Sequence, residues 1–318
     1  MKVPAAIKAL DDKASDLIIG LMRIVVGTLW LANIEWKRPP DFGFKAKNGL
    51  YKYVDSALRN PVLGVHKYFI QHVVLPNYTF FGWVTLFTEV ALAVTLILGW
   101  HTRIAALVGA FMSINIGLSV LYYDKAAEWP WSYYLMFAAH LLIFAIAAGK
   151  HIGLDGVLKR DGAARRGALR VLGLVSVVVA ILGLVVARNT GFAAKQGALL
   201  GWARGELKVL WFTPLSALLT LLFGALGVAS AQLRRKEIGL IGAAGFAVMA
   251  LFTLLQWRAL DAGGWTGGIF GGTGANMAFW AMMALGMGRC AYGATSSNDA
   301  VMTADATPLV MKKSAPAA

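Results

Sequence analysis

The sequence predicts an all-α integral membrane protein with an N-terminal four-helix bundle followed by about four further transmembrane helices. Of its 318 residues, 58% are hydrophobic and 14% are charged, and the mean hydropathy is +0.64. Soluble domains carry about 25% charged residues, so the polar surface here is too small for a water-soluble globule. Apolar windows of about 18–20 residues recur, and each is long enough to cross a hydrocarbon core of roughly 30 Å. Because backbone groups in lipid must pair within their own segment, these windows should be helices.

The apolar windows follow one another with mostly short connections. The first four make up the N-terminal bundle, and the last is the shortest. A basic linker separates the bundle from the later helices, and the chain ends in a stretch rich in Ala, Ser, Thr and Pro that we expect to be disordered. The expected spans are 17–34, 82–99, 104–122, 131–148, 170–187, 213–231, 238–256 and 276–290. The expected regions are a four-helix transmembrane domain at 1–164, a second transmembrane helical domain at 165–293 and a disordered polar tail at 294–318.

Two segments outside the spans have patterns of their own. Residues 1–16 are polar and are expected to form a short interfacial helix ahead of the first span. Residues 35–81 form a long connection rich in Tyr and Trp, whose rings suit the headgroup layer of a membrane. Apolar residues recur in it at roughly helical spacing, which predicts one or two interfacial helices covering the outer mouth of the bundle. They are Val54, Leu58, Val62, Val65 and Phe69.

The net charge of +14 lies largely in the connections between the spans. Basic residues in short loops remain on the cytoplasmic side of a membrane. The basic loops 149–169 and 232–237 fall on the same side as the N-terminus if every span crosses once. We therefore expect a multi-pass protein of the plasma membrane with both termini in the cytoplasm. No motif for nucleic-acid binding is visible, so the expected partners are the lipid bilayer and either another protein or a second copy of the chain.

Each span of the N-terminal bundle carries a polar residue at depth. Glu89 lies near the middle of span 82–99, where a carboxylate costs roughly 3 kcal/mol or more and should face a partner or a cavity. Arg23, Asn115 and His140 lie at similar depth in the other three spans. Because an arginine side chain is long, we expect Arg23 to reach Glu89 and pair with it. Such a pair either only fixes the register of the helices or belongs to a functional site, and both alternatives stay open here. Asn115 also suits a hydrogen bond between helices.

Cysteine and histidine usage excludes several cofactors. The single cysteine, Cys290, cannot form an intrachain disulfide or hold an iron–sulfur cluster or zinc. The histidines are scattered, and only His140 lies deep in a span, so a haem held by two histidines is not expected. We therefore expect no haem, iron–sulfur or zinc site, and we assign no metal ligands.

Three motifs together resemble the DoxD/DoxX family of small membrane proteins. The first is Leu21-Met-Arg-Ile-Val-Val-Gly27, with Trp36-Lys37 after it. The second is Glu89-Val-Ala-Leu-Ala-Val-Thr-Leu-Ile-Leu-Gly-Trp-His-Thr-Arg103, and the third is Gly149-Lys-His-Ile-Gly-Leu-Asp155. The long connection with Trp-Lys-Arg-Pro-Pro is more similar to DoxD than to the shorter DoxX proteins. The resemblance covers residues 15–160, whereas 165–318 does not resemble the DoxA partner domain.

The resemblance implies a bundle related to the membrane subunit of thiosulfate:quinone oxidoreductase in a respiratory chain. Electrons from thiosulfate or from a partner protein would then pass to quinone, the expected cofactor. A non-enzymatic scaffold or assembly subunit of a respiratory or redox complex is the alternative. A transporter is a third possibility, although broken-helix pairs are not evident. The candidate catalytic residues are Glu89, His140 and Arg23, and the candidate cofactor-binding residues are His140, Glu89, Trp83, Tyr133 and Asn115.

Overall fold

A computed structural model describes most of the chain as helix, as predicted. The described residues are 5–34, 36–37, 39–122, 130–202, 207–257 and 268–294. The expected disordered tail lies outside them, apart from Ala294. The buried apolar side chains form one cluster that includes Trp30 and Leu86 from the first half and Trp280 from the second. The two halves therefore share a core.

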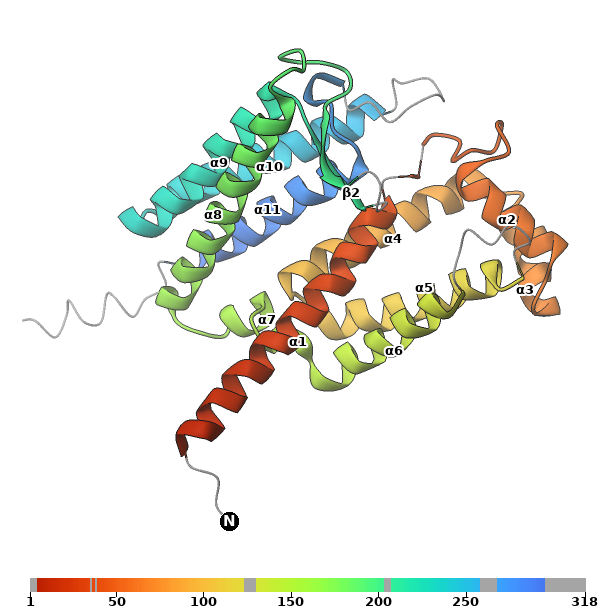
Figure 1. Cartoon of the computed structure of the whole chain (residues 1–318), viewed down its shortest axis with the longest axis horizontal. Helices are drawn as coiled ribbons and strands as arrows, with labels where there is room; N and C mark the ends of the chain where they lie inside the picture. Colours follow the sequence, from red (N-terminus) through yellow and green to blue (C-terminus); the bar gives the residue numbers. More distant parts are fainter. Residues whose placement is uncertain are drawn as a thin grey trace, which may run out of the picture.

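The N-terminal bundle consists of two helix pairs. Helix α1 (Ala5–Ile34) packs along α4 (Tyr78–Leu98), and α5 (Thr102–Val120) packs along α6 (Pro130–Ile146) (Figure 1). These helices coincide with the first four expected spans. The separate interfacial helix expected at residues 1–16 is wrong, because α1 continues through this segment from Ala5 without a break.

The second half adds four long helices and a small hairpin. They are α8 (Gly162–Ala187), α9 (Pro214–Leu233), α10 (Lys236–Trp257) and α11 (Gly274–Tyr292). Consecutive helices pack against each other, and α11 also packs against α4 and α1 of the first half (Figure 1). Between α8 and α9 the chain forms an antiparallel hairpin of β1 (Ala198–Trp202) and β2 (Leu207–Phe212). A short 3₁₀ helix, η4 (Gly268–Phe270), precedes α11.

The length and apolar composition of the helices define an integral membrane protein. Among the described residues, six helices can cross a membrane by these criteria: α1, α4, α5, α8, α9 and α10. Helix α6 is a shorter apolar helix, and α11 is not among the six. Most residues of α11 are buried among the other helices, so this helix does not require the apolar surface that lipid demands. In the part of the chain that the structure describes, eight helices match the eight expected spans, and six of them meet the criteria for crossing alone.

Short helices cover the two ends of the bundle. At one end, α2 (Gly49–Arg59), α3 (Gly64–Phe69) and the π-helix η1 (Ile70–Val74) lie beside α4 and α5, which confirms the helices predicted in the long connection (Figure 1). We call this the capped end. At the opposite end, a 3₁₀ helix, η2 (Ala148–Lys150), and α7 (Leu154–Val157) join α6 to α8.

Candidate functional site

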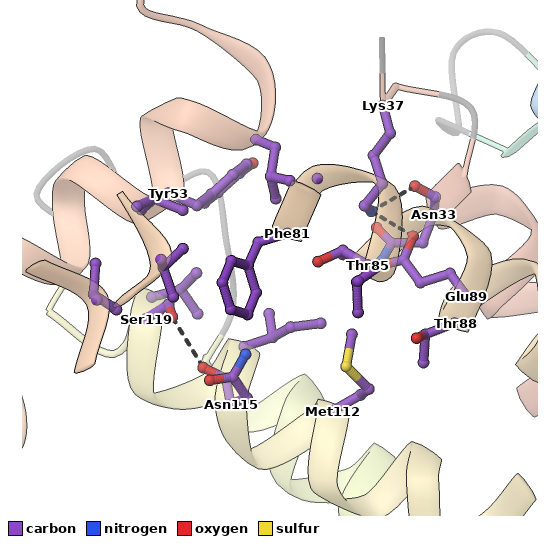
Figure 2. Close-up of a pocket in the computed structure, with 18 of the residues that line it drawn as sticks. Asn33, Lys37, Tyr53, Phe81, Thr85, Thr88, Glu89, Met112, Asn115 and Ser119 are labelled. Atoms are coloured by element: carbon purple, nitrogen blue, oxygen red, sulfur yellow. Dashed lines mark hydrogen bonds and ion pairs between the residues drawn. The ribbon is translucent and has the colours of Figure 1, made fainter. Parts of the chain in front are cut away.

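A cavity of about 250 Å³ lies at the capped end, between α4, α5 and the short helices that cover them. We call it the capped cavity. Its walls are largely apolar, and polar side chains reach it from two sides. Figure 2 shows Asn33, Lys37 and Glu89 together on one side and Asn115 on the other. The polar residues that line it include Asn33, Lys37, Tyr53, His66, Thr85, Thr88, Glu89, Asn115, Ser119 and Tyr133.

Glu89 pairs with Lys37, not with Arg23 as expected. The distance from Lys37 Nζ to Glu89 Oε2 is 2.6 Å, and the two side chains are 1% and 0% exposed. Asn33 Nδ2 donates a hydrogen bond of 2.9 Å to Glu89 Oε1. Taking two charges out of water costs several kcal/mol for each ion, and their attraction together with added hydrogen bonds offsets that cost. The membrane-embedded carboxylate thus has a dedicated cation and an amide partner.

The end of α1 positions Lys37. Because the helix ends at Ile34, the carbonyl of Asn33 is one of the last four without a partner in the helix. Lys37 Nζ donates to that carbonyl at 3.0 Å, which also places the cation at the negative end of the helix dipole. The Trp36 ring lies 3.9 Å from Lys37 Nζ, and its Nε1 donates to Asn33 Oδ1 at 2.9 Å. The Asn33 carbonyl and the Trp36 ring therefore hold the ammonium against Glu89, and the bond from Trp36 to Asn33 fixes the ring.

The opposite wall carries a polar pair. His66 Nε2 lies 3.3 Å from Asn115 Oδ1, which joins α3 to α5. His66 Nδ1 is buried and has no hydrogen-bond partner within the described part of the chain. If Nε2 carries the proton donated to Asn115, Nδ1 is an acceptor that a ligand can use. The cavity therefore combines an ion pair on one wall with an amide and an imidazole on the other.

His140 lies outside the lining of the capped cavity, between α1, α5 and α6. Its Nδ1 lies 2.6 Å from Met136 O, and its Nε2 lies 3.1 Å from Trp30 Nε1. An indole Nε1 only donates, so Nε2 accepts and Nδ1 carries the proton. The ring sits directly over Gly109, where a Cβ atom would overlap it. Both nitrogens are thus occupied by the protein, and this geometry gives His140 a packing role.

Arg23 fastens α1 to the end of the bundle opposite the cavity. Its guanidinium donates to Leu96 O, to Ile97 O at 2.9 Å and to Ile152 O at 2.9 Å. The first two are carbonyls at the C-terminus of α4, where a cation is favourable. Gly99 makes this contact possible, because its φ of 69° ends the helix and a Cβ would lie 2.7 Å from Arg23 Cζ. The expected Arg23–Glu89 pair is wrong because the helix terminus attracts the guanidinium instead.

Asp155 connects α7 to the start of α5 at the same end of the bundle as Arg23. Its carboxylate accepts hydrogen bonds from the backbone nitrogens of His101 and Thr102 at 2.8 and 3.2 Å, and from Thr102 Oγ1 at 3.0 Å. It therefore caps the N-terminus of α5, where an anion is favourable. The second and third motifs of the sequence meet here in space. Their Gly-Trp-His-Thr and Leu-Asp segments build a structural joint, whereas Glu89 of the second motif faces the cavity.

The structure places some of the predicted site residues at the capped cavity and others elsewhere. Glu89, Asn115 and Tyr133 line the capped cavity. Arg23 and His140 do not, and Trp83 packs edge-on against Phe42 and lines a neighbouring groove. Sequence reasoning missed Asn33, Lys37 and His66. For Lys37, the adjacent Trp36 was a usable signal, because an aromatic ring next to a cation at a helix end favours a fixed ammonium.

These features define a multi-pass, all-α integral membrane protein with a charged cavity at one end of its first bundle. The family model described as "TQO small subunit DoxD" matches residues 19–178, about half of the chain, and the protein belongs to that family. The match includes the whole of the capped cavity and extends into α8. Comparisons with curated proteins and with solved structures gave no match.

Proposed function

We propose that this protein is the membrane subunit of a quinone-linked oxidoreductase, and that the capped cavity holds the quinone ring. The observation that carries the proposal is the buried Lys37–Glu89 pair on the wall of an otherwise apolar cavity. Ionisable groups within membrane spans are costly and mark substrate or proton pathways. A cavity with apolar walls and a few convergent polar groups is the usual form of a small-molecule site. The family description supports the same assignment.

The polar groups on the two walls suit the two carbonyl oxygens of a quinone. On one wall, Lys37 and the Asn33 amide are hydrogen-bond donors. On the other wall, the amide nitrogen of Asn115 is also a hydrogen-bond donor. Reduction of a quinone to a quinol takes two electrons and two protons. In the proposal, Glu89 and Lys37 exchange the protons, since both are held at the cavity by fixed contacts. The electrons come from thiosulfate or from a protein partner.

The test compares quinone content and turnover in the same preparations. Purified protein should carry quinone detectable by mass spectrometry of its extracted lipid, and thiosulfate should reduce that quinone in the presence of the native partners. Glu89→Gln should keep quinone but slow its reduction, because the amide retains the shape but cannot take up and release a proton. A wild-type protein without quinone and without reduction under these conditions supports the scaffold alternative instead. Arg23 and His140 both make their hydrogen bonds within the protein, which favours the scaffold alternative.

We also propose that the protein lies in the plasma membrane with both termini in the cytoplasm. The basic residues around 150–170 and 234–236 support this orientation, because such loops are retained on the cytoplasmic side. Reporter fusions after Ala164 should be active as cytoplasmic reporters, and fusions after Asp261 should be active only as external ones. The reverse pattern would invert the orientation.

A further inference from the structure

A second hollow runs along the outside of the bundle, between α4 and α5. It is a groove of about 590 Å³ with almost entirely apolar walls, and we call it the lateral groove. Helix α4 contributes one stripe of residues at intervals of three and four, and α5 contributes another. The lining residues are Phe80, Trp83, Val84, Phe87, Thr88, Ala91, Leu92, Thr95, His101, Ile104, Ala105 and Val108.

The lateral groove and the capped cavity adjoin each other along α4 and α5. Val84 and Thr88, one turn apart on α4, line both. On α5, the face that lines the groove at Ile104 and Val108 continues along the same stripe to Met112, which lines the cavity. Figure 2 shows Thr88 and Met112 at the edge of the cavity, beside Glu89. The lateral groove therefore lies directly beside the cavity that contains the ion pair, and the two share part of their walls.

The packing of the bundle leaves the lateral groove open to the outside of the bundle. Helix α4 makes most of its contacts with α1, and α5 with α6, whereas α4 and α5 touch each other much less. The side chains at the mouth of the groove are exposed, with Phe87 at 45% and Ile104 at 64%. In a membrane-spanning bundle these residues face lipid. The groove is consequently accessible from the hydrocarbon core of the bilayer without passing through water.

The size of the capped cavity requires a second space for the tail if a quinone is bound there. Its volume of about 250 Å³ is close to the lower limit of roughly 300 Å³ for small-molecule sites, so it accepts a ring but not a long hydrocarbon chain. We propose that the lateral groove binds the isoprenoid tail of the quinone whose ring occupies the capped cavity, and that quinone enters and leaves sideways between α4 and α5. This inference rests on the proposed function. The tail is the chosen occupant because the groove adjoins a cavity with polar groups for a ring, which a lipid acyl chain does not require.

The experiment measures the contribution of the tail to binding. Purified protein in lipid nanodiscs is titrated with two probes, a dimethoxy-methyl-benzoquinone without a tail and the same ring with a decyl tail. Ala91→Phe and Val108→Phe place a ring in the groove from opposite walls, and neither residue lines the capped cavity. Ala138→Phe is the matched control, since Ala138 is exposed on α6 away from both hollows. Each groove variant should weaken binding of the decyl probe by about tenfold, because apolar contact area is lost.

The two probes separate the possible failures. Binding of the ring without a tail should be the same in the wild type and in all three variants. If the groove variants leave the decyl probe unaffected while the bare ring still binds, the tail does not use the groove and the proposed function stands. If the groove variants instead release a tightly bound phospholipid and leave decyl binding unchanged, the groove holds an acyl chain and the inference is overturned. If the bare ring does not bind the wild type, the proposed function itself fails, and the tail site with it.

Discussion

The two halves of the molecule differ in the kind of polar group they bury. The first half buries Arg23, Lys37, Glu89 and His140, whereas the buried polar residues described in the second half are hydroxyls and one amide. Several of those hydroxyls donate to a carbonyl of their own helix, as Thr253 does to Met249 O and Ser176 to Leu172 O. Such groups are satisfied locally and require no partner. Among the described residues, buried charge is therefore confined to the half that contains the capped cavity, and we infer that the second half supports the first.

The strongest test of this comparison removes one partner of the buried pair. Lys37→Met leaves the Glu89 carboxylate without its cation, and breaking a buried pair in this way costs about 3–5 kcal/mol. The double variant Lys37→Met with Glu89→Gln should recover at least half of the loss, because no charge then remains unpaired. Thermal unfolding in a single detergent measures both. Losses that simply add would show that the two charges do not depend on each other.

A matched pair of amides tests whether the two halves have separate roles. Asn276 bonds to the backbone nitrogen and oxygen of Trp211 at 2.9 Å each and accepts from Thr273 N at 3.1 Å, which fastens α11 to the hairpin. Asn276→Leu should cost about 2–3 kcal/mol of stability, since buried backbone groups lose their partners. It should leave the quinone content of the folded protein unchanged.

Asn115→Leu should have the opposite result. Asn115 faces the capped cavity, and its side chain contacts His66 there, so the substitution should deplete quinone while shifting the unfolding midpoint less than Asn276→Leu does. Extracted quinone per mole of folded protein, measured beside the unfolding midpoint, separates the two effects. Equal loss of quinone in both variants would mean that the second half also contributes to the site.

The sequence predicts the helices of this fold well because length and apolar composition decide membrane spans. Even the covering helices α2 and α3 were predictable, since Val54 and Phe69 belong to a helical repeat in an otherwise polar connection. The hairpin was not predicted. Residues 188–212 lie between two expected spans and are amphipathic, which indicates a connection and not a pair of strands. The long α1 was also missed, since polar residues at its start resemble a separate interfacial segment.

The candidate site was only partly predictable, for a physical reason that Lys37 and Arg23 illustrate. Glu89 is recognisable because a carboxylate within an apolar run is costly. Its partner is not, because Lys37 lies beyond the apolar run and reaches Glu89 only after α1 has ended. Arg23 lies within a span and looks like the better partner. Its true acceptors are backbone carbonyls, two at the C-terminus of α4 and one at Ile152, and backbone acceptors leave no mark in a sequence.

The smallest expected effect is the coupling between Arg23 and Glu89, and it decides whether the charges of the first half form one network or two separate groups. Arg23 bonds to Leu96 O, seven residues along α4 from Glu89, which is about 10 Å at 1.5 Å per residue. Substitutions so far apart, with no shared partner, add within about 0.5 kcal/mol. Arg23→Gln and Glu89→Gln should each destabilise the protein, and the double variant should lose the sum of the two in detergent unfolding. A coupling as large as that expected for Lys37 and Glu89 would show that the Arg23 contacts and the capped cavity depend on each other. The charged site would then extend through the whole first bundle and not be limited to one end of it.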